Sequence, residues 1–280
     1  MKVISLIENT CTNRELKSEH GLSLYIEIND KKYLLDTGAS GDFIKNAAKL
    51  NVDLMNIDAV IISHNHYDHI GGLEKLITLN PKVKIYIKAE AKNDYYKKIL
   101  FFNLLIGNKD KLFDKYKENF VFINEKLELD GGVTLLSNKV QDKAFFCKDK
   151  SLCKSTDKGI VEDDFKHELF VLVNLNGKGV ILSSCSHNGI VNIVATVKEL
   201  YPHMNIKAII GGFHMKGTLG MNSINCTEDY INQVIKNLKA LEVEKIYTCH
   251  CTGMKAFKLM KNLLNEDIEY FKTGQELIIE

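Results

Sequence analysis

The stretch VIISHNHYDHIGGL, residues 60–73, decides how this chain is interpreted. Four side chains that bind metals well lie within six residues, directly after an apolar run: His64, His66, Asp68 and His69. The chain has nine histidines in all, so this is a local concentration. The apolar run is typical of a buried strand, and the following Gly-Gly pair is typical of a turn. Ligands at the end of a buried strand are held rigidly while the turn stays open to substrate.

The spacing within this stretch predicts two metal positions. His64 and His66 are two residues apart, so they point the same way in an extended segment. Asp68 and His69 follow after the chain turns and reach a second point. Two imidazoles for one ion, and a carboxylate with an imidazole for another, suit divalent metals such as zinc. Each ion needs a further ligand, and two other predicted strands end at histidines, His187 in SSCSHNG and His250 in TCHCTG.

The rest of the chain predicts an α/β organisation. Short apolar runs predict strands over residues 2–8, 22–28, 31–36, 58–63 and 82–87, with helices over 41–50 and 71–79. An Asn-Gly turn predicts a hairpin over 168–184, followed by strands over 206–212 and 244–250 that alternate with helices over 189–201, 227–241 and 252–264. Residues 90–165 have weaker periodicity. We interpret them as helical and loop excursions with one or two strands (119–123, 132–137), serving either as surface elaboration or as a lid or pocket wall.

Composition excludes several classes of protein. The chain has 280 residues and a formal net charge of +1, which argues against a nucleic-acid partner. No apolar run approaches the ~18 residues of a membrane span. Seven cysteines without an export signal favour reduced thiols. We expect one cytoplasmic domain over residues 1–280 with a small-molecule substrate, and the oligomeric state stays open.

The motifs resemble those of the metallo-β-lactamase fold superfamily over essentially the whole chain. HNHYDH matches its H-x-H-x-D-H signature, and LLDTGAS matches its aspartate turn. More narrowly, EHGLS, SCSHNGIVNI, GGFH and HCTG are similar to a branch that includes archaeal synthases of a dihydropterin ribofuranosyl-aminobenzene phosphate and bacterial metal-dependent hydrolases. The resemblance implies an αββα sandwich of two mixed β-sheets flanked by helices, with a metal site along one edge.

The resemblance also implies a ligand set for two divalent ions, with zinc favoured and manganese or iron as alternatives. It assigns His64, His66 and His187 to the first metal, and Asp68, His69 and His250 to the second. One position departs from the common pattern, because Ser-Cys-Ser-His stands where many members carry a bridging aspartate. Either Cys185 or His187 replaces that carboxylate or the bridge is absent, and His167 is a rival third ligand for the first metal.

Other residues receive roles around this centre. Asp36 is expected to orient a metal-bound histidine, although a turn aspartate also caps its own backbone. Asp68 and His214 are the expected proton-transfer groups, and Asn9 and His20 are expected to line the substrate pocket. The cysteines on either side of His250 are interpreted as structural, because strand alternation directs them away from it: Cys249 and Cys251.

These features predict a metal-dependent hydrolase that uses a metal-activated hydroxide on a small phosphorylated or ester-bearing metabolite. Members with a redox di-iron centre carry glutamate where this chain has Asn65, so oxygen reduction is disfavoured. One alternative is a pterin-linked synthase on the same metal site. Its aromatic pocket would come from residues that could equally form the core face of a helix: Tyr95, Tyr96, Phe101 and Phe102. The other alternative is a metabolite-binding or regulatory protein on a hydrolase fold.

Overall fold

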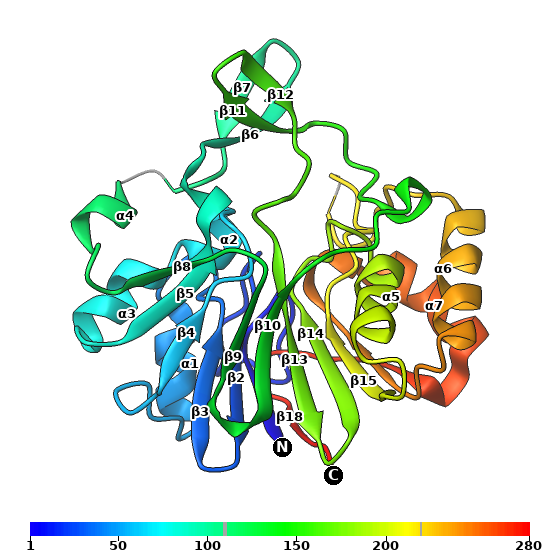
Figure 1. Cartoon of the computed structure of the whole chain (residues 1–280), viewed down its shortest axis with the longest axis horizontal. Helices are drawn as coiled ribbons and strands as arrows, with labels where there is room; N and C mark the ends of the chain where they lie inside the picture. The colour runs from blue at the N-terminus through cyan, green and yellow to red at the C-terminus, as the bar shows by residue number, and fades with distance from the viewer. Residues whose placement is uncertain (109–110, 219) are drawn as a thin grey trace. The chain divides into compact units, whose positions relative to one another are not determined.

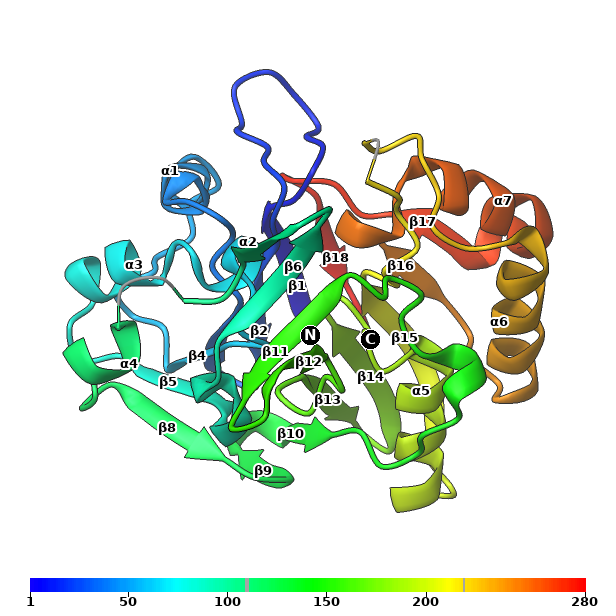
Figure 2. The same cartoon turned by 90° about the horizontal axis from the view of Figure 1, so that it is seen from above.

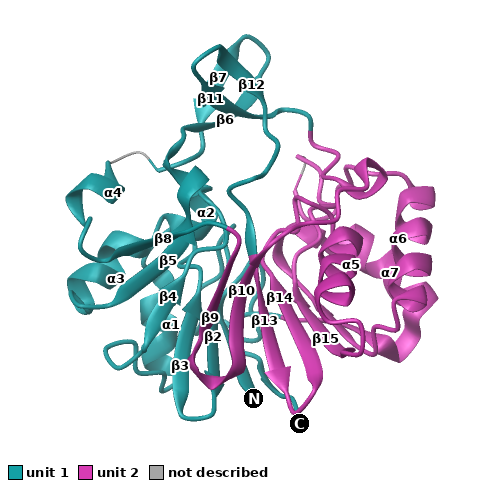
Figure 3. Cartoon of the chain, viewed as in Figure 1, with its two compact units in different colours: residues 1–124, 150–169, 272–280 teal, residues 125–149, 170–271 magenta. Residues whose placement is uncertain are grey.

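The computed structural model describes residues 1–108, 111–218 and 220–280 and divides the chain into two compact units (Figure 3). Unit 1 comprises residues 1–124, 150–169 and 272–280, and unit 2 comprises residues 125–149 and 170–271. Among the described residues, no helix has both the length and the apolar character needed to cross a bilayer.

Unit 1 is built on a seven-stranded mixed sheet. The strand order is β18 (Glu276–Ile278), β1 (Lys2–Ile7), β2 (Ser23–Ile28), β3 (Lys31–Leu35), β4 (Ala59–Ile61), β5 (Lys84–Lys88) and β8 (Phe120–Ile123). The strands from β18 to β3 pair antiparallel, and those from β3 to β8 pair parallel. Six of these strands match predicted ones within a residue or two, whereas β18 was not predicted.

Helices cover one face of this sheet (Figure 1). They are α1 (Asp42–Lys49), α2 (Tyr67–Ile70), α3 (Leu73–Leu79) and α4 (Leu112–Lys115), with a 3-10 turn η1 (Ala89–Lys92) after β5. The core of the unit forms where Phe43 of α1 and Leu76 of α3 pack against strand residues such as Val60. Burying these side chains anchors the end of β4, from which the histidine-rich stretch emerges.

A separate four-stranded antiparallel sheet corrects the expected reading of residues 90–165. Its order is β12 (Gly159–Glu162), β11 (Leu152–Thr156), β6 (Tyr95–Ile99) and β7 (Phe102–Leu105), and Figure 2 shows β6 beside β11. We expected mainly helices and loops here, with strands only near 119–123 and 132–137. The alternative in which the aromatic residues of this segment form the core face of a helix is wrong, because they lie on β6, on β7 and in the turn between them: Tyr95, Tyr96, Phe101 and Phe102.

Unit 2 has its own seven-stranded mixed sheet. The order is β17 (Ile268–Tyr270), β16 (Ile246–Thr248), β15 (Asn205–Gly211), β14 (Lys178–Ser183), β13 (Leu169–Leu175), β10 (Val133–Ser137) and β9 (Lys126–Leu129). Strands β14 to β17 are parallel. The helices α5 (Ile190–Leu200), α6 (Glu228–Ala240) and α7 (Met254–Leu264) pack on this sheet (Figure 1). Short 3-10 turns complete the unit: η2 (Asp130–Gly132), η3 (Lys143–Phe145), η4 (His250–Thr252) and η5 (Asn265–Asp267).

The hairpin predicted in unit 2 is confirmed. The β13–β14 hairpin turns at Asn176 and Gly177, both with positive φ (50° and 90°), as a two-residue turn of this type requires. Helix α6 is capped at its N-terminus by Thr227, whose hydroxyl accepts a hydrogen bond from the Tyr230 N–H at 3.1 Å.

Candidate metal centre

The histidine-rich stretch forms a tight imidazole cluster in unit 1. The His64 ring centroid lies 4.5 Å from that of His66 and 4.2 Å from that of His69. All three side chains are buried, and Asp68 is nearly so, at 7% exposure. Burial and the neighbouring His167 lower the pKa of His66 to about 3. The ring is therefore neutral at pH 7, which is the state that binds metals.

The carboxylate of Asp36 fixes two of these rings. It accepts three hydrogen bonds of 2.7 Å, from the Ser63 N–H, the Ser63 hydroxyl and the His69 Nδ1–H. Because the Ser63 hydroxyl gives its hydrogen to Asp36, it accepts from the His64 Nδ1–H at 2.8 Å. Both rings therefore carry a proton on Nδ1, so Nε2 is the atom that would face a metal. Metal-binding histidines commonly have a carboxylate or another acceptor in this position.

His167 lies beside the cluster but has both ring nitrogens engaged. Its Nδ1 accepts from the Asn65 N–H at 3.1 Å, and its Nε2 bonds the Asp163 carboxylate at 3.1 Å. Tyr95 stacks on the ring with centroids 3.7 Å apart. Burial alone would raise the pKa of Asp163, but the His167 and His66 imidazoles more than offset it, so this pKa lies below its usual value. His167, the rival third ligand for the first metal, would therefore have to break one of these two hydrogen bonds to bind a metal.

His20, which we expected to line the substrate pocket together with Asn9, lies close to Asp68. Its Oδ2 lies 3.4 Å from His20 Nε2 and 3.6 Å from His69 Nε2. Asn9 Nδ2 lies 3.2 Å from His20 Nδ1. The three residues thus form a chain of polar contacts that runs from the cluster to the partly exposed His20 ring.

The Gly-Gly pair lets the histidine-rich stretch pack closely on the Asp36 turn. A Cβ added to Gly72 would lie 2.1 Å from the Ser40 carbonyl oxygen and 2.2 Å from that of Thr37. Contacts this short with backbone leave no room for any side chain. The Thr37 N–H donates to the His69 carbonyl at 2.7 Å, which joins the two segments. The two glycines therefore allow the histidine-rich stretch to lie directly against the turn that carries the Asp36 carboxylate.

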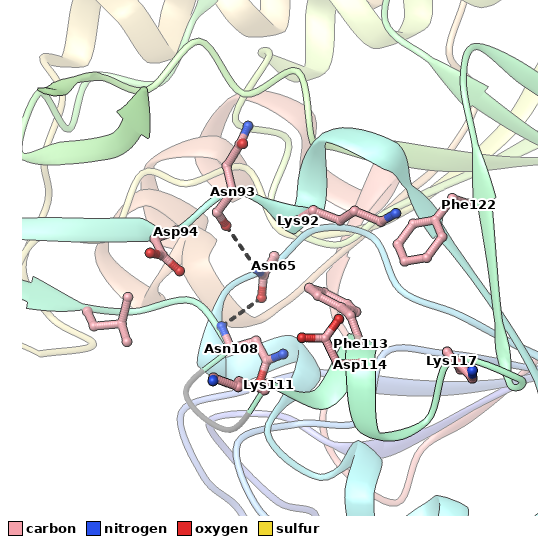
Figure 4. A pocket seen from close by; sticks show the side chains of 11 residues that line it. Asn65, Lys92, Asn93, Asp94, Asn108, Lys111, Phe113, Asp114, Lys117 and Phe122 are labelled. Carbon is pink, nitrogen blue, oxygen red and sulfur yellow. Dashed lines mark hydrogen bonds between the residues drawn. The ribbon is translucent and has the colours of Figure 1, made fainter. Parts of the chain in front are cut away.

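A pocket of about 510 Å³ lies beside Asn65, the residue between the first two histidines (Figure 4). The Asn65 amide donates to the Ala91 carbonyl at 2.7 Å and accepts from the Asn108 N–H at 2.9 Å. Three lysines and two aromatic rings line the pocket, together with two aspartates: Lys92, Lys111, Lys117, Phe113, Phe122, Asp94 and Asp114. The Lys92 ammonium lies 4.0 Å from the centroid of the Phe122 ring.

Unit 2 holds the other predicted histidines at its strand ends. His187 follows β14 and His250 follows β16 in η4, and both are buried. The His187 ring lies 4.3 Å from that of His214, the expected proton donor. Burial alone would lower the pKa of His214, but the Cys147 and Cys251 thiols beside it raise this pKa well above its usual value.

Two thiol clusters in unit 2 were missed from the sequence. Donor atoms lie within 4.8 Å of one another in the set Cys147, His187 and His214, and again in the set Cys185, His214 and Cys251. Cys251 was interpreted as structural because strand alternation would direct its side chain away from His250. The strand ends at Thr248, however, and a 3-10 turn brings this thiol toward Cys185. The signals in the sequence were the spacing of TCHCTG and the Cys185 of SSCSHNG.

The donor set of unit 1 fits a divalent metal. Its rings are buried, and two of them are held by Asp36 in the tautomer that exposes Nε2. A carboxylate lies beside them at Asp68. Imidazole and carboxylate together suit zinc, manganese or iron.

Comparisons with known proteins agree with this chemistry. Residues 18–138 match a model of the metallo-beta-lactamase superfamily. The 7,8-dihydropterin-6-methyl-4-(beta-D-ribofuranosyl)-aminobenzene-5'-phosphate synthase of Methanocaldococcus jannaschii is 30% identical, over 98% of this chain and 95% of its own. An uncharacterised protein of the same organism is 28% identical, over 93% of this chain and 94% of its own. A solved metal-dependent hydrolase of the beta-lactamase superfamily superposes with a TM-score of 0.84 at 27% identity, covering 100% of this chain and 99% of its own. This match confirms the fold class predicted from the sequence.

Proposed function

The chain belongs to the metallo-beta-lactamase superfamily, and from this premise we propose that it is a metal-dependent hydrolase of a small phosphorylated or ester-bearing metabolite. The observation that carries the proposal is the Asp36 network, which holds the His69 ring directly and the His64 ring through the Ser63 hydroxyl, each by its Nδ1. A carboxylate network of this kind around buried imidazoles is typical of metal-binding histidines.

The proposed ligand set follows donor chemistry and the family resemblance. His64, His66 and His187 would hold one ion, and Asp68, His69 and His250 a second, with the Cys185 thiolate in place of the bridging aspartate. Zinc is the favoured ion, because imidazole, carboxylate and thiolate are all common zinc ligands. His167 is left out of the set, since its two ring nitrogens already bond Asn65 and Asp163.

A bound divalent metal supplies Lewis-acid chemistry, which polarises phosphoryl or carbonyl oxygens. The residues of this chain supply proton transfer around it. Asp68 accepts a proton at Oδ2, and His20, whose Nε2 lies 3.4 Å away, passes it to solvent because its side chain is 40% exposed. Asn9 holds the His20 ring through Nδ1. His214 carries a proton for the leaving group, in keeping with its raised pKa.

The pocket beside Asn65 supports an anionic substrate. Its volume of about 510 Å³ suits a small metabolite. Lysines bind phosphate as point charges, and here three of them, Lys92, Lys111 and Lys117, lie around two aromatic rings. A phosphorylated compound with a flat ring would satisfy both features.

A synthase activity on a pterin is the second candidate. One observation favours it: the archaeal relative that is 30% identical over nearly the whole chain is named as such a synthase. The same metal ligands and the same pocket would serve it.

The test compares substrate classes on the metal-loaded protein. We would measure kcat and KM for bis-p-nitrophenyl phosphate, p-nitrophenyl phosphate and p-nitrophenyl acetate. The double variant Lys92→Ala/Lys117→Ala should raise KM for the phosphorylated substrates by about tenfold, the loss of roughly one charge-assisted contact. It should leave the uncharged ester unaffected. Lys178→Ala, an exposed lysine of unit 2, is the matched control. Equal effects on all three substrates would remove the pocket from the proposal.

A further inference from the structure

The β6–β7 hairpin of unit 1 exposes an unusual concentration of large apolar side chains. At its turn Phe101 is 95% exposed, Leu100 82% and Phe102 75%. Two further residues of the hairpin are about half exposed, Ile99 on β6 and Leu104 on β7. Single exposed apolar residues are ordinary on a soluble protein, but contiguous ones mark a site of interaction.

The apolar side chains of this hairpin would supply most of one side of a protein–protein interface. A large apolar side chain presents about 150–250 Å² when fully exposed, so the five side chains together present on the order of 600 Å². The largest apolar patch of a typical monomer is roughly 300–600 Å². A specific interface of standard size buries about 800 Å² on each partner.

The hairpin also offers an open sheet edge. β7 is the last strand of the order β12-β11-β6-β7, and within the described residues no strand pairs with its outer side. Natural edge strands are usually protected by lysine, proline or a bulge. The β7 sequence FNLL has neither lysine nor proline, and its register with β6 is regular. A flat apolar edge of this kind is a template for another strand.

We propose that β7 pairs antiparallel with β7 of a second copy of this chain, so that the four-stranded sheet continues across a two-fold axis. An antiparallel pair of identical strands is self-complementary, as a two-fold interface requires. Centring the pair on Asn103 places Phe102 of one copy opposite Leu104 of the other. Both side chains project from the same face of the sheet, because they alternate with Asn103 along β7. Phe102 of each copy then packs beside Leu104 of the other.

The charges around the hairpin favour a protein partner over an anionic membrane. Lysines and acidic residues are interspersed on the four strands and their turns: Lys97, Lys98, Lys154 and Lys158 against Asp94, Asp157 and Glu162. Lys154 is moreover paired with Asp164. An anionic lipid surface attracts clusters of basic residues, whereas a mixture of both signs suits the rim of an interface between copies.

Sedimentation equilibrium of the full chain at micromolar concentration tests the interface. The wild type should be a dimer, and Phe101→Ser/Phe102→Ser should weaken dimerisation at least about tenfold, as loss of central apolar anchors does. Met55→Ser, which removes an exposed apolar side chain elsewhere in unit 1, should leave the dimer intact. A monomeric wild type would overturn the proposal, and so would equal effects of the two changes. Binding of the monomer to anionic vesicles through the hairpin would assign the patch to lipid and overturn it as well.

A cysteine cross-link tests the register without disturbing the apolar residues. Asn103→Cys should give a covalent dimer under mild oxidation, because directly opposed residues lie about 5 Å apart at Cα, within disulfide reach. Lys98→Cys, its neighbour on β6, would lie three strands from its counterpart, at roughly 14 Å, and should cross-link no more than wild type. Cross-linking of both variants to the same extent would refute the pairing. Neither experiment depends on metal or on activity, so its failure is separate from a failure of the proposed hydrolase function.

Discussion

Replacing Asp36 with asparagine should weaken metal binding without removing any proposed ligand. The wild-type carboxylate accepts three hydrogen bonds of 2.7 Å, from the Ser63 N–H, the Ser63 hydroxyl and His69 Nδ1–H. An amide of the same shape keeps one acceptor oxygen. Its NH2 group must face a donor, so the His69 ring either loses its partner or moves its proton to Nε2, the atom that should bind the metal.

The magnitude follows from the role of such acceptors. Removing the hydrogen-bond partner of a metal-bound histidine typically costs about 10- to 100-fold in metal affinity, or about 1.4–2.8 kcal/mol. The effect of Asp36→Asn should lie near the upper end of that range. One carboxylate serves His69 directly and His64 through the Ser63 hydroxyl, so two ligands are perturbed together.

The assay is zinc competition against a chromophoric chelator, starting from metal-free protein. The matched control is Asp58→Asn, because Asp58 also accepts a backbone N–H, that of Lys32 at 2.8 Å, but lies partly exposed and away from the histidines. The control should bind zinc as wild type does. Unchanged zinc affinity in a folded Asp36→Asn protein would refute the argument that this network prepares the metal site.

Three shorter predictions concern the support of the fold. Gly72→Ala should destabilise the protein by at least about 1–3 kcal/mol in chemical denaturation, because the added Cβ would overlap backbone oxygens. Gly41→Ala is the control and should cost little, because its Cβ meets only the flexible Lys75 side chain. Equal losses of stability in the two variants would contradict the close backbone contact at Gly72. Because the pKa of Asp163 is lowered in the folded protein, its contribution to stability is present above its unfolded pKa near 3.8 and is lost as pH falls through the lower folded value. Asp163→Asn should therefore flatten the acid limb of the stability curve below about pH 4, and an unchanged limb would contradict the pair with His167. Thr227→Ala should cost about 1 kcal/mol by loss of the α6 cap, and no change in the free energy of unfolding would show that the cap contributes nothing.

The regular parts of the fold were predictable because local and tertiary preferences agree there. The strand before His64 is a buried apolar run, and the Asn176-Gly177 pair can adopt the positive φ values of its turn with little strain. The four-stranded sheet was missed for a physical reason. Its hairpin turns at Leu100, with φ of 51°, and Phe101, so no glycine, proline or asparagine marks the turn. The stretch KKILFFNLL, residues 97–105, consequently has no turn former at its centre that would distinguish two short strands from one helix.

Some features of the candidate site were likewise predictable from the sequence, and others were not. The residues His64, His66, Asp68 and His69 were found from their spacing, which is local information. Contacts between distant segments were not accessible in this way. Nothing near His167 in the sequence indicates that its Nδ1 bonds the N–H of Asn65, 102 residues away. The pocket beside Asn65 likewise draws its lysines from separate turns, and spacing along the chain carries no trace of that convergence.

The most direct test of the central claim is metal content and turnover measured on the same samples of wild type and His66→Ala. Plasma mass spectrometry would count the metals, and bis-p-nitrophenyl phosphate would report hydrolysis. A metal-dependent hydrolase with the proposed ligands should hold about two divalent ions per chain, and the variant should lose both metal and turnover. A wild-type protein that takes up no metal on reconstitution, or a variant that keeps its full metal content and activity, would contradict the account.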